Sequence, residues 1–433
     1  MAALPGDFAF NEMKATAAAA RGYTSLIPPE AGTSFTGGQI ITINIPAAGP
    51  GEYLRASECD LRFTVKNSGA NAATTNDCYF SGGAYACIEK IEVYHGSTLL
   101  SSQDDYGTLH SVMYDTTVSS NYRQGIGALL HGTNNCDLGS ATADTIKGAT
   151  IGRNGGTYTA AIQLINPLVG TLAERALPIG LMSADLSLRI TMASDAKAFV
   201  TTGTPVITYS DVNFSAVIVQ LDPSIDQAIA SDNNGVLAFH ASDFRMYQHS
   251  LAQNSTFDIV QLPIRFSSCR YALHLFRCAA NLTDKTKESV TGREKATLSR
   301  YQYRLASQMV PQRPIEVATA NVSQVVVELL RMMGRYESYG DDQGVVFTDT
   351  SIFTNDDVAA AAEQGTFLFG ADITAFGGTR DSLVNSGLNL LSTPVALEMS
   401  FTAIPHDARL TTFASFDTLF SLDLATGLLS VRF

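Results

Sequence analysis

Histidines, cysteines and paired acidic residues are the side chains of this sequence that could carry chemistry, and their spacing matches no catalytic motif. Seven histidines stand singly along the 433 residues, outside any HExxH or other metal-ligand pattern: His95, His110, His131, His240, His249, His274 and His406. No GxSxG nucleophile elbow precedes a predicted helix, and no GxxxxGK phosphate loop is present. The sequence therefore predicts a protein that is not an enzyme, with no catalytic, cofactor-binding or metal-binding residues and no cofactor.

Paired aspartates are the next candidates for chemistry. They occur at Asp104-Asp105, Asp341-Asp342 and Asp356-Asp357. We interpret them as helix caps and solvated loop residues. For the pairs in loops, calcium bound between subunits is the alternative, because carboxylate oxygens are its preferred ligands.

The cysteines also lack a metal-binding pattern. Six are present, none of them in a CxxC pair, which argues against a structural zinc site: Cys59, Cys78, Cys87, Cys136, Cys269 and Cys278. Cys59, Cys269 and Cys278 lie in or beside apolar runs and are interpreted as small core residues. Cys78 and Cys87 flank a loop; they either form a disulfide or remain free thiols, and free thiols are the rule in a cytoplasm.

Composition and charge exclude several classes of function. Hydrophobic residues make up 45% of the chain, enough for two cores, whereas charged residues make up only 16%. The net charge is −13, and the first fifty residues contain only two basic side chains, Lys14 and Arg21. A chain without a basic arm or patch is not expected to bind nucleic acid directly. We also find no signal peptide and no apolar run of membrane-spanning length, so we expect synthesis in a cytoplasm without membrane insertion.

Most of the chain alternates between apolar and polar residues with the period of two that is typical of half-buried antiparallel strands. The polar segment 223–235, which follows Leu221 and Asp222, has no apolar period and divides the strands into two groups. The predicted strands of the first group are 39–46, 53–66, 87–100, 157–165, 185–192 and 212–221, and those of the second are 236–247, 257–266, 271–278, 301–308, 366–375, 395–404 and 416–424. We therefore divide the chain into an N-terminal helix and arm (1–38), a first domain (39–222), a linker (223–235) and a second domain (236–433).

Three helices are predicted among the strands. Residues 7–21 are rich in alanine and follow a possible cap at Asp7. Residues 104–116 begin at Asp104 or Asp105, and their apolar residues fall on one face. Residues 322–336 have the clearest pattern, with Asn321 and Gln324 as a capping box.

The chain contains four long polar segments, 67–84, 122–156, 281–300 and 336–365. Each half has two of them, one on either side of its helix. Long insertions are tolerated where they do not clash with neighbours. We therefore expect all four at one outward-facing end of the molecule, with residues 1–30 at the opposite, inner end.

This organisation resembles the double jelly-roll major capsid proteins of tailless icosahedral viruses. The resemblance lies in residues Phe80–Asp115, where a glycine-rich approach, a hairpin and a helix follow one another, in Leu177–Met192, where a Leu-Pro segment precedes an alternating strand, and in Asn321–Glu337, the helix of the second half. It implies an all-β fold of two tandem eight-stranded jelly-roll β-sandwiches, each with a short helix, plus a short N-terminal helix.

The resemblance also implies a function and partners. The chain would be a structural subunit of a virion, forming pseudo-hexagonal homotrimeric capsomers that contact neighbouring capsomers and minor capsid and vertex proteins. In many members the N-terminal helix lies beneath the shell against lipid or minor proteins, and residues 7–21 match it in position. The open alternative is a viral or bacterial spike or lectin-like binding protein built from two β-sandwiches.

Overall fold

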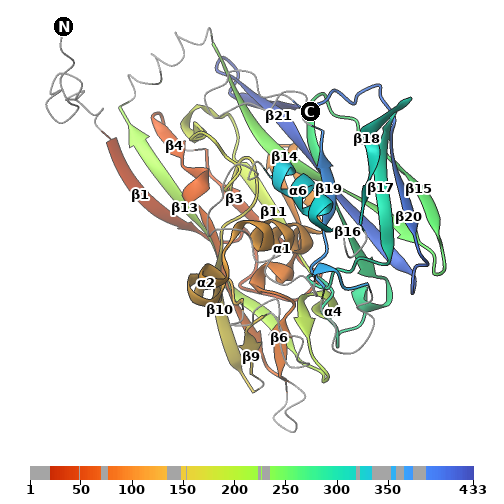
Figure 1. Ribbon diagram of the computed structural model, residues 1–433. Coiled ribbons are helices and arrows are strands. Elements are labelled where there is room, and N and C mark those ends of the chain that lie inside the picture. Colours follow the sequence, from red (N-terminus) through yellow and green to blue (C-terminus); the bar gives the residue numbers. More distant parts are fainter. Residues whose placement is uncertain are drawn as a thin grey trace, which may run out of the picture.

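The structure is a computed structural model that describes most of the chain. The described residues are 20–47, 49–69, 77–133, 148–152, 154–222, 226, 235–317, 322–333, 353–356, 365–373 and 387–433. They form two β-sandwiches that stand side by side, with helix α1 (Tyr106–Thr117) near the centre of the molecule (Figure 1).

The first sandwich consists of two principal sheets. Its strands are β1 (Ala20–Ile27), β2 (Ser34–Phe35), β3 (Ile40–Ile45), β4 (Glu52–Leu54), β5 (Asp60–Asn67), β6 (Cys78–Phe80), β7 (Ile88–His95), β8 (Thr98–Asp104), β9 (Thr150–Ile151), β10 (Gly156–Ile162), β11 (Leu186–Met192), β12 (Phe199–Val200) and β13 (Ile207–Leu221). One sheet has the order β1-β13-β5-β10, with β2 and β4 also paired to β13, and the other has the order β3-β11-β7-β8. A small sheet, β12-β6-β9, lies at one end.

The second sandwich has the same plan. Its strands are β14 (Val236–Leu251), β15 (Phe257–Leu262), β16 (Cys269–Cys278), β17 (Leu298–Leu305), β18 (Gln308–Glu316), β19 (Phe369–Asp372), β20 (Val395–Phe401), β21 (Ala408–Asp423) and β22 (Leu428–Arg432). One sheet has the order β14-β21-β16-β19, with β22 on the edge of β21, and the other has the order β15-β20-β17-β18.

The two sandwiches share one topology. If the eight strands on the main paths of the two principal sheets of each sandwich are numbered along the chain, the sheets have the orders 1-8-3-6 and 2-7-4-5 in both. Helix α1 (Tyr106–Thr117) and helix α6 (Val322–Met332) each follow the fifth of these strands and precede the sixth. This is the jelly-roll arrangement, in which neighbouring strands come from distant parts of the sequence. The sequence pattern predicted the fold class and the place of both helices correctly.

The remaining helical segments are short. They are the α-helices α2 (Ser120–Tyr122), α3 (Ala128–Leu130) and α4 (Asp195–Ala198), the 3-10 helices Ala56–Glu58, Ala84–Cys87, Ile179–Leu181 and Ala280–Leu282, and a π-helix, Arg123–Gly127. Within the described part of the chain, no helix has the length and apolar character needed to cross a bilayer.

Alternating burial explains why the sequence pattern identified many of these strands. In β3, β5 and β11 every second side chain is buried between the two sheets of the first sandwich. Strand β16 differs, because side chains on both of its faces are buried. One face of its sheet packs against the other sheet of the second sandwich. On the opposite face, β14 and β16 contact the first sandwich.

Four predicted elements need correction. The predicted helix 7–21 lies outside the described residues up to residue 19, but Ala20 and Arg21 belong to β1, whose pairing with β13 overrides the helix propensity of alanine. The predicted strand 53–66 is two strands separated by a 3-10 helix. The predicted loops 67–84 and 122–156 contain strands and helices in their described parts, including β6 in the first loop and α3 and β9 in the second. Strand β18 was not predicted.

The predicted domain limits fall close to strand ends. Strand β13 ends at Leu221 and β14 begins at Val236, and only Asp226 and Gly235 of the predicted linker are described. Asp226 is buried, accepting hydrogen bonds from the Gly51 amide (2.6 Å) and the Tyr53 hydroxyl (2.6 Å).

Candidate functional site: the junction between the two sandwiches

A buried polar junction joins the outer face of the sheet β14-β21-β16 to strand β8 and helix α1. The first residue of this junction is Asp105, which lies between β8 and α1. Its carboxylate accepts hydrogen bonds from the Thr108 hydroxyl (2.7 Å) and the Lys197 ammonium (2.7 Å), and it pairs with the Arg277 guanidinium of β16. Arg277 also donates to the Thr108 hydroxyl at 2.9 Å, so the contact joins the two sandwiches through two acceptors.

The charge of Asp105 is stabilised by these partners. Burial alone would raise its pKa, but the nearby Arg277 and Lys197 lower it below its usual range. The sequence analysis interpreted Asp104-Asp105 as a solvated helix cap, which is wrong for Asp105. It occupies the N-cap position, but its φ of 50° is left-handed and its side chain makes no capping bond to the helix backbone.

Asp115, near the end of α1, carries a second buried ion cluster. It pairs with the guanidinium groups of Arg123, from the π-helix, and of Arg293, from the second sandwich, the latter at 2.5 Å. The side chains of all three residues are 1% exposed or less. A carboxylate between two buried guanidinium groups is stable only while all the charges remain together.

A third buried acid, Asp243 of β14, faces the edge of β8, and no cation of the described residues contacts it. Its carboxylate accepts hydrogen bonds from the Ser101 hydroxyl (2.8 Å) and the Gln103 amide (2.7 Å) of β8, and from its neighbour's backbone amide. Burial raises its pKa to about 6, against the lowering effect of these hydrogen bonds and of Arg245.

The four long polar segments also meet at the junction. The Val290 amide donates to the Ser81 hydroxyl (3.2 Å), and the Thr201 amide donates to the Lys285 carbonyl (2.7 Å). Within the described residues, segment 281–300 also contacts segment 336–365 through the Arg293 amide, which donates to the Gly365 carbonyl (3.0 Å), and segment 67–84 contacts segment 122–156 through the Ala84 amide, which donates to the His131 carbonyl (2.6 Å). Described parts of the four segments are therefore linked, and their position at one outward-facing end stays a prediction.

Segment 281–300 is nevertheless not the exposed loop that the sequence analysis expected. Its residues from Ser289 to Ala296 are buried, apart from the half-buried Gly292. Arg293, one of the charged residues that suggested a solvated loop, forms part of the junction through its pair with Asp115. Lys295 is 5% exposed and pairs with Asp356 at 3.0 Å within the second sandwich, while the Asp356 side chain is 45% exposed, in agreement with its interpretation as a solvated acid.

The end of the chain adds a contact that does not depend on charge. The Gly427 carbonyl accepts hydrogen bonds from the Ser183 amide (2.9 Å) and the Ser183 hydroxyl (3.0 Å) of the first sandwich. Gly427 has a φ of +67°, and a Cβ atom on it would lie 2.7 Å from the Ser183 nitrogen. A glycine is therefore needed at this contact.

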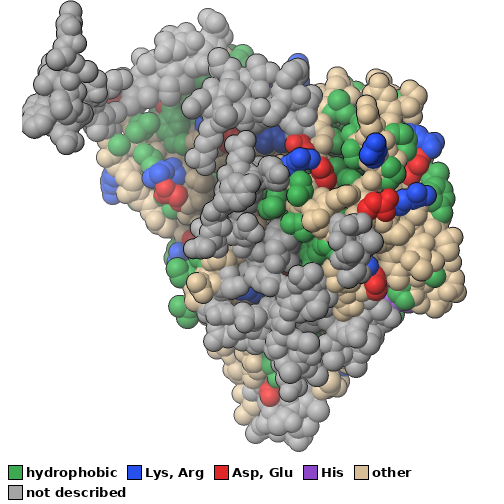
Figure 2. Space-filling model, in the orientation of Figure 1, with side chains coloured by type: hydrophobic (Ala, Val, Ile, Leu, Met, Phe, Trp, Pro, Cys, Tyr) green, Lys and Arg blue, Asp and Glu red, His purple; other side chains and the backbone are tan. Residues whose placement is uncertain are grey.

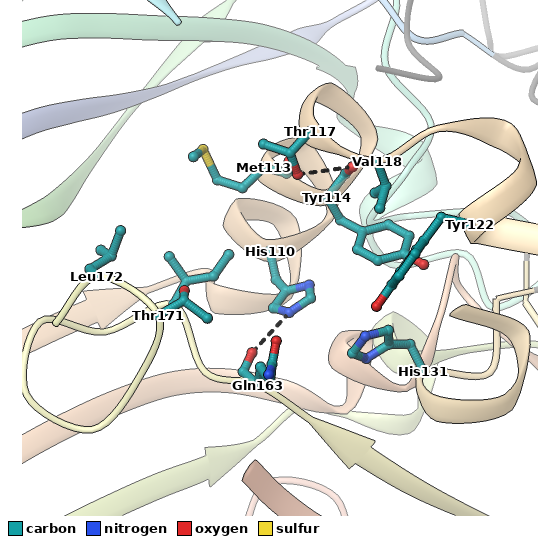
Figure 3. Close-up of a pocket in the computed structure, with 11 residues that line it drawn as sticks. His110, Met113, Tyr114, Thr117, Val118, Tyr122, His131, Gln163, Thr171 and Leu172 are labelled. Carbon is teal, nitrogen blue, oxygen red and sulfur yellow. Dashed lines mark hydrogen bonds between the residues drawn. The ribbon is translucent and has the colours of Figure 1, made fainter. Parts of the chain in front are cut away.

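A cavity of about 280 Å³ lies beside α1 in the first sandwich (Figure 3). His110, Tyr114 and His131 line it, and the rings of His110 and His131 are 5.9 Å apart. Burial lowers the pKa of His110 to about 3 and that of His131 to about 4, so both rings are neutral at ordinary pH. These histidines are isolated in the sequence, and their position side by side was not predicted.

The other candidates from the sequence are distributed as follows. His274 is a buried core residue whose ring nitrogens contact the Thr412 hydroxyl (2.7 Å) and the Tyr303 hydroxyl (2.6 Å). Cys78 and Cys87 are both buried free thiols, so the disulfide alternative is not realised. Among the described residues, no three histidine, cysteine or acidic side chains are grouped to hold a metal ion. Residues Asp341, Asp342, Asp357 and Cys136 lie outside the described residues.

Known proteins resemble this chain in structure and not in sequence. No model of a known protein family matches it, and no curated protein does. Among solved structures, the PBCV-1 virus capsid matches with a TM-score of 0.60 and 12% identity, over 98% of this chain and 99% of that one. The Faustovirus major capsid protein matches with a TM-score of 0.60 and 8% identity, over 95% and 92% of the two chains. The mavirus major capsid protein matches with a TM-score of 0.55 and 10% identity, over 100% and 95%.

The chain has the double jelly-roll fold. The matches cover nearly the whole length of this chain and of the capsid proteins, so both sandwiches and their relative placement are included. At these identities the likeness establishes the fold, and function requires an argument from the molecule itself.

Proposed function

We propose that this chain is the major capsid protein of an icosahedral virus, a structural subunit without enzymatic activity. The observation that carries the proposal is the duplication: two sandwiches of identical topology are held side by side by buried ion clusters at Asp105 and Asp115. A shell tile needs two such rigid lobes in fixed relation, whereas a binding module needs one exposed site. The full-length likeness to capsid proteins supports the same reading by analogy.

The proposed capsomer is a homotrimer. Three chains around a threefold axis place six similar sandwiches in a ring, which gives a pseudo-hexagonal outline that can tile a closed shell. Its contacts are with copies of itself, with neighbouring capsomers, and with minor capsid and vertex proteins. The N-terminal residues 7–21 remain the candidate for contact with an internal membrane or minor protein.

The net charge and the distribution of charged side chains support the proposal that the chain does not bind the genome. The net charge is −13, and Figure 2 shows acidic and basic side chains interspersed on the described surface of the second sandwich. Phosphate backbones are bound through concentrated positive charge, which this surface does not present. The virion is then the site of action, and the host cytoplasm the site of synthesis.

Light scattering of the purified protein at high concentration tests the capsomer. A mass of three chains supports the proposal, and a monodisperse monomer contradicts it. Mixing the same sample with DNA or RNA at near-physiological salt should give no binding. Binding that weakens steeply with added salt would show that the chain contacts nucleic acid after all.

A further inference from the structure

The cavity beside α1 has a buried floor and an exposed rim. The floor consists of buried side chains, which are His110, Tyr114, His131 and Ile165. The rim includes exposed side chains, which are Thr117, Gln163 and Thr171. The cavity therefore opens toward solvent along its rim, and a small molecule can reach the floor without disrupting the core of the sandwich.

Two imidazole rings lie next to each other at the floor (Figure 3). The His110 Nε2 atom lies 3.3 Å from the Gln163 carbonyl oxygen, which can only accept a hydrogen bond, so this nitrogen carries the proton. The Nδ1 atoms of His110 and His131 are buried, and neither has a hydrogen-bond partner among the described residues. The same holds for the whole side chain of His131, which makes no hydrogen bond to the described part of the chain. A ligand with a hydrogen-bonding group would satisfy this ring and recover the free energy that its burial costs.

The rest of the wall is aromatic and apolar. The ring of Tyr114 lies 5.3 Å from that of His131 and 6.4 Å from that of Tyr122, in edge-to-face contact with both. Thioether and aliphatic side chains complete the wall, namely Met113, Val118, Ile165 and Leu172. Among the described residues, no Asp, Glu, Lys or Arg lines the cavity. An ion inside it would lose its hydration without gaining a counter-charge, so the wall favours an uncharged occupant.

The volume of the cavity sets the size of that occupant. An apolar cavity of about 150 Å³ holds a benzene molecule. A cavity of about 280 Å³ therefore has room for two fused rings and is too small for a folded peptide segment. Aromatic ligands also suit the wall, because rings pack well against one another in edge-to-face and offset contacts.

We propose that this cavity is a binding site for a compact, uncharged aromatic molecule that carries one hydroxyl group. The ligand rings pack against Tyr114 and Tyr122, and the hydroxyl group hydrogen-bonds the neutral ring of His131. His131 selects the hydroxyl group because its side chain has no hydrogen bond to the described residues, whereas His110 already donates to Gln163. The inference does not depend on the proposed role in a shell, because the cavity lies within one sandwich.

Binding should stabilise the folded chain. The lining residues come from three parts of the first sandwich: His110 and Tyr114 from α1, His131 from the residue after α3, and Ile165 and Leu172 from the segment after β10. These parts lie at the cavity only in the folded state, so the unfolded chain offers no comparable site. A ligand that binds only the folded state raises the unfolding temperature as its concentration increases.

The test uses three probes that share one ring system and differ in the polar group: 2-naphthol, naphthalene and 2-naphthoate. Calorimetry and thermal unfolding of the full-length protein measure their binding. 2-Naphthol should bind with one molecule per chain, raise the unfolding temperature, and have an affinity about fivefold or more above that of naphthalene, because it supplies the missing hydrogen bond. 2-Naphthoate should bind at least about tenfold more weakly than 2-naphthol, because its charge has no partner in the cavity. No saturable binding of 2-naphthol up to its solubility limit, or equal affinity for 2-naphthoate, would overturn the proposal.

Variants at the rim place the binding in this cavity. Thr171→Trp fills the cavity from its rim and should abolish binding of both 2-naphthol and naphthalene. The matched control is Thr157→Trp, which puts the same side chain at an exposed position of β10 outside the cavity and should leave both affinities unchanged. Binding of 2-naphthol to Thr171→Trp with the affinity of the original chain would mean that the ligand lies elsewhere, which contradicts the proposal.

A variant at the floor tests the role of His131. His131→Phe keeps an aromatic ring of similar size and removes both nitrogens, so 2-naphthol should lose its advantage of about fivefold while naphthalene binds as before. A preference for 2-naphthol that persists in this variant would overturn the assignment of its hydroxyl partner. If Thr171→Trp does not fold, the loss of preference in His131→Phe still locates the ligand in the cavity.

Discussion

The junction buries carboxylates in two different ways. Asp105 and Asp115 each contact two cationic side chains, whereas Asp243, within the described part of the chain, contacts only neutral donors from β8 and the Phe244 backbone amide. The pKa of Asp105 is consequently lowered and that of Asp243 is raised to about 6. Two acids in the same interface therefore respond to pH in opposite directions, because local partners outweigh the burial that they share.

The largest effect is expected at the ion cluster of Asp115. Asp115→Asn leaves the guanidinium groups of Arg123 and Arg293 buried without their counter-charge, which costs about 3–5 kcal/mol of unfolding free energy. Urea or guanidinium denaturation at neutral pH measures the change. A loss below about 1 kcal/mol would mean that the cluster is hydrated or rearranges freely.

At Asp243 the charge of the carboxylate is expected to lower the stability of the fold. Its folded-state pKa of about 6 lies above the unfolded value of about 3.9, so the folded state holds the proton more tightly. Its contribution to stability is therefore fully present below the unfolded value and lost as the pH rises through about 6.

Asp243→Asn removes this penalty while keeping acceptors for Gln103 and Phe244 and a donor for the Ser101 hydroxyl. The variant should be more stable than the original chain by on the order of 2 kcal/mol at pH 8 and nearly equal to it at pH 4. Denaturation curves at both pH values make the comparison. A variant that is destabilised equally at both would show that Asp243 is a hydrogen-bonding residue whose charge is irrelevant.

The uncharged contact at Gly427 should contribute less to the stability of the fold than the ion clusters do. Gly427→Ala places a Cβ atom against the Ser183 backbone at a left-handed residue, and a loss of about 1–2 kcal/mol is expected. Thermal unfolding at neutral pH measures it. The loss should not change with pH, in contrast to Asp243→Asn, and a pH-dependent loss would indicate that the chain end is coupled to the acids of the junction.

The smallest effect is expected at a surface pair. Arg62 and Asp60 pair at 2.6 Å on β5, with the Arg62 side chain 47% exposed. Asp60→Asn should change stability by less than about 1 kcal/mol, because solvent already screens the pair. This variant is the control for Asp115→Asn, since both convert an arginine-paired aspartate to asparagine. Similar losses in the two would contradict the role given to burial.

The sequence was sufficient for the alternating strands and the two amphipathic or capped helices, because these follow from local periodicity. The sequence did not predict β18, because this segment contains two prolines and has the composition of a loop. That strand lies at the edge of its sheet, where a missing N–H costs little. Strand β1 was missed for a different reason, since its pairing partner β13 lies about 190 residues away.

The junction could not be predicted, because its partners are far apart in the chain. Arg277 and Asp105 are separated by 172 positions, and Arg293 and Asp115 by 178. One local signal was available: Asp115 is the only Asp, Glu, Lys or Arg in the α1 sequence YGTLHSVMYDTT. An isolated charge within an otherwise uncharged helix indicates a buried partner, and segment 281–300 contained candidates of the right sign.

Electron microscopy of the purified or co-expressed protein tests the central claim most directly. If the chain is a capsid tile, images should show closed shells or sheets of pseudo-hexagonal units, each with six lobes contributed by three chains. Asp115→Asn should reduce assembly, and Asp60→Asn should leave it unchanged. A discrete oligomer that never forms shells at any concentration or pH would contradict the account and favour a spike or lectin-like binding protein.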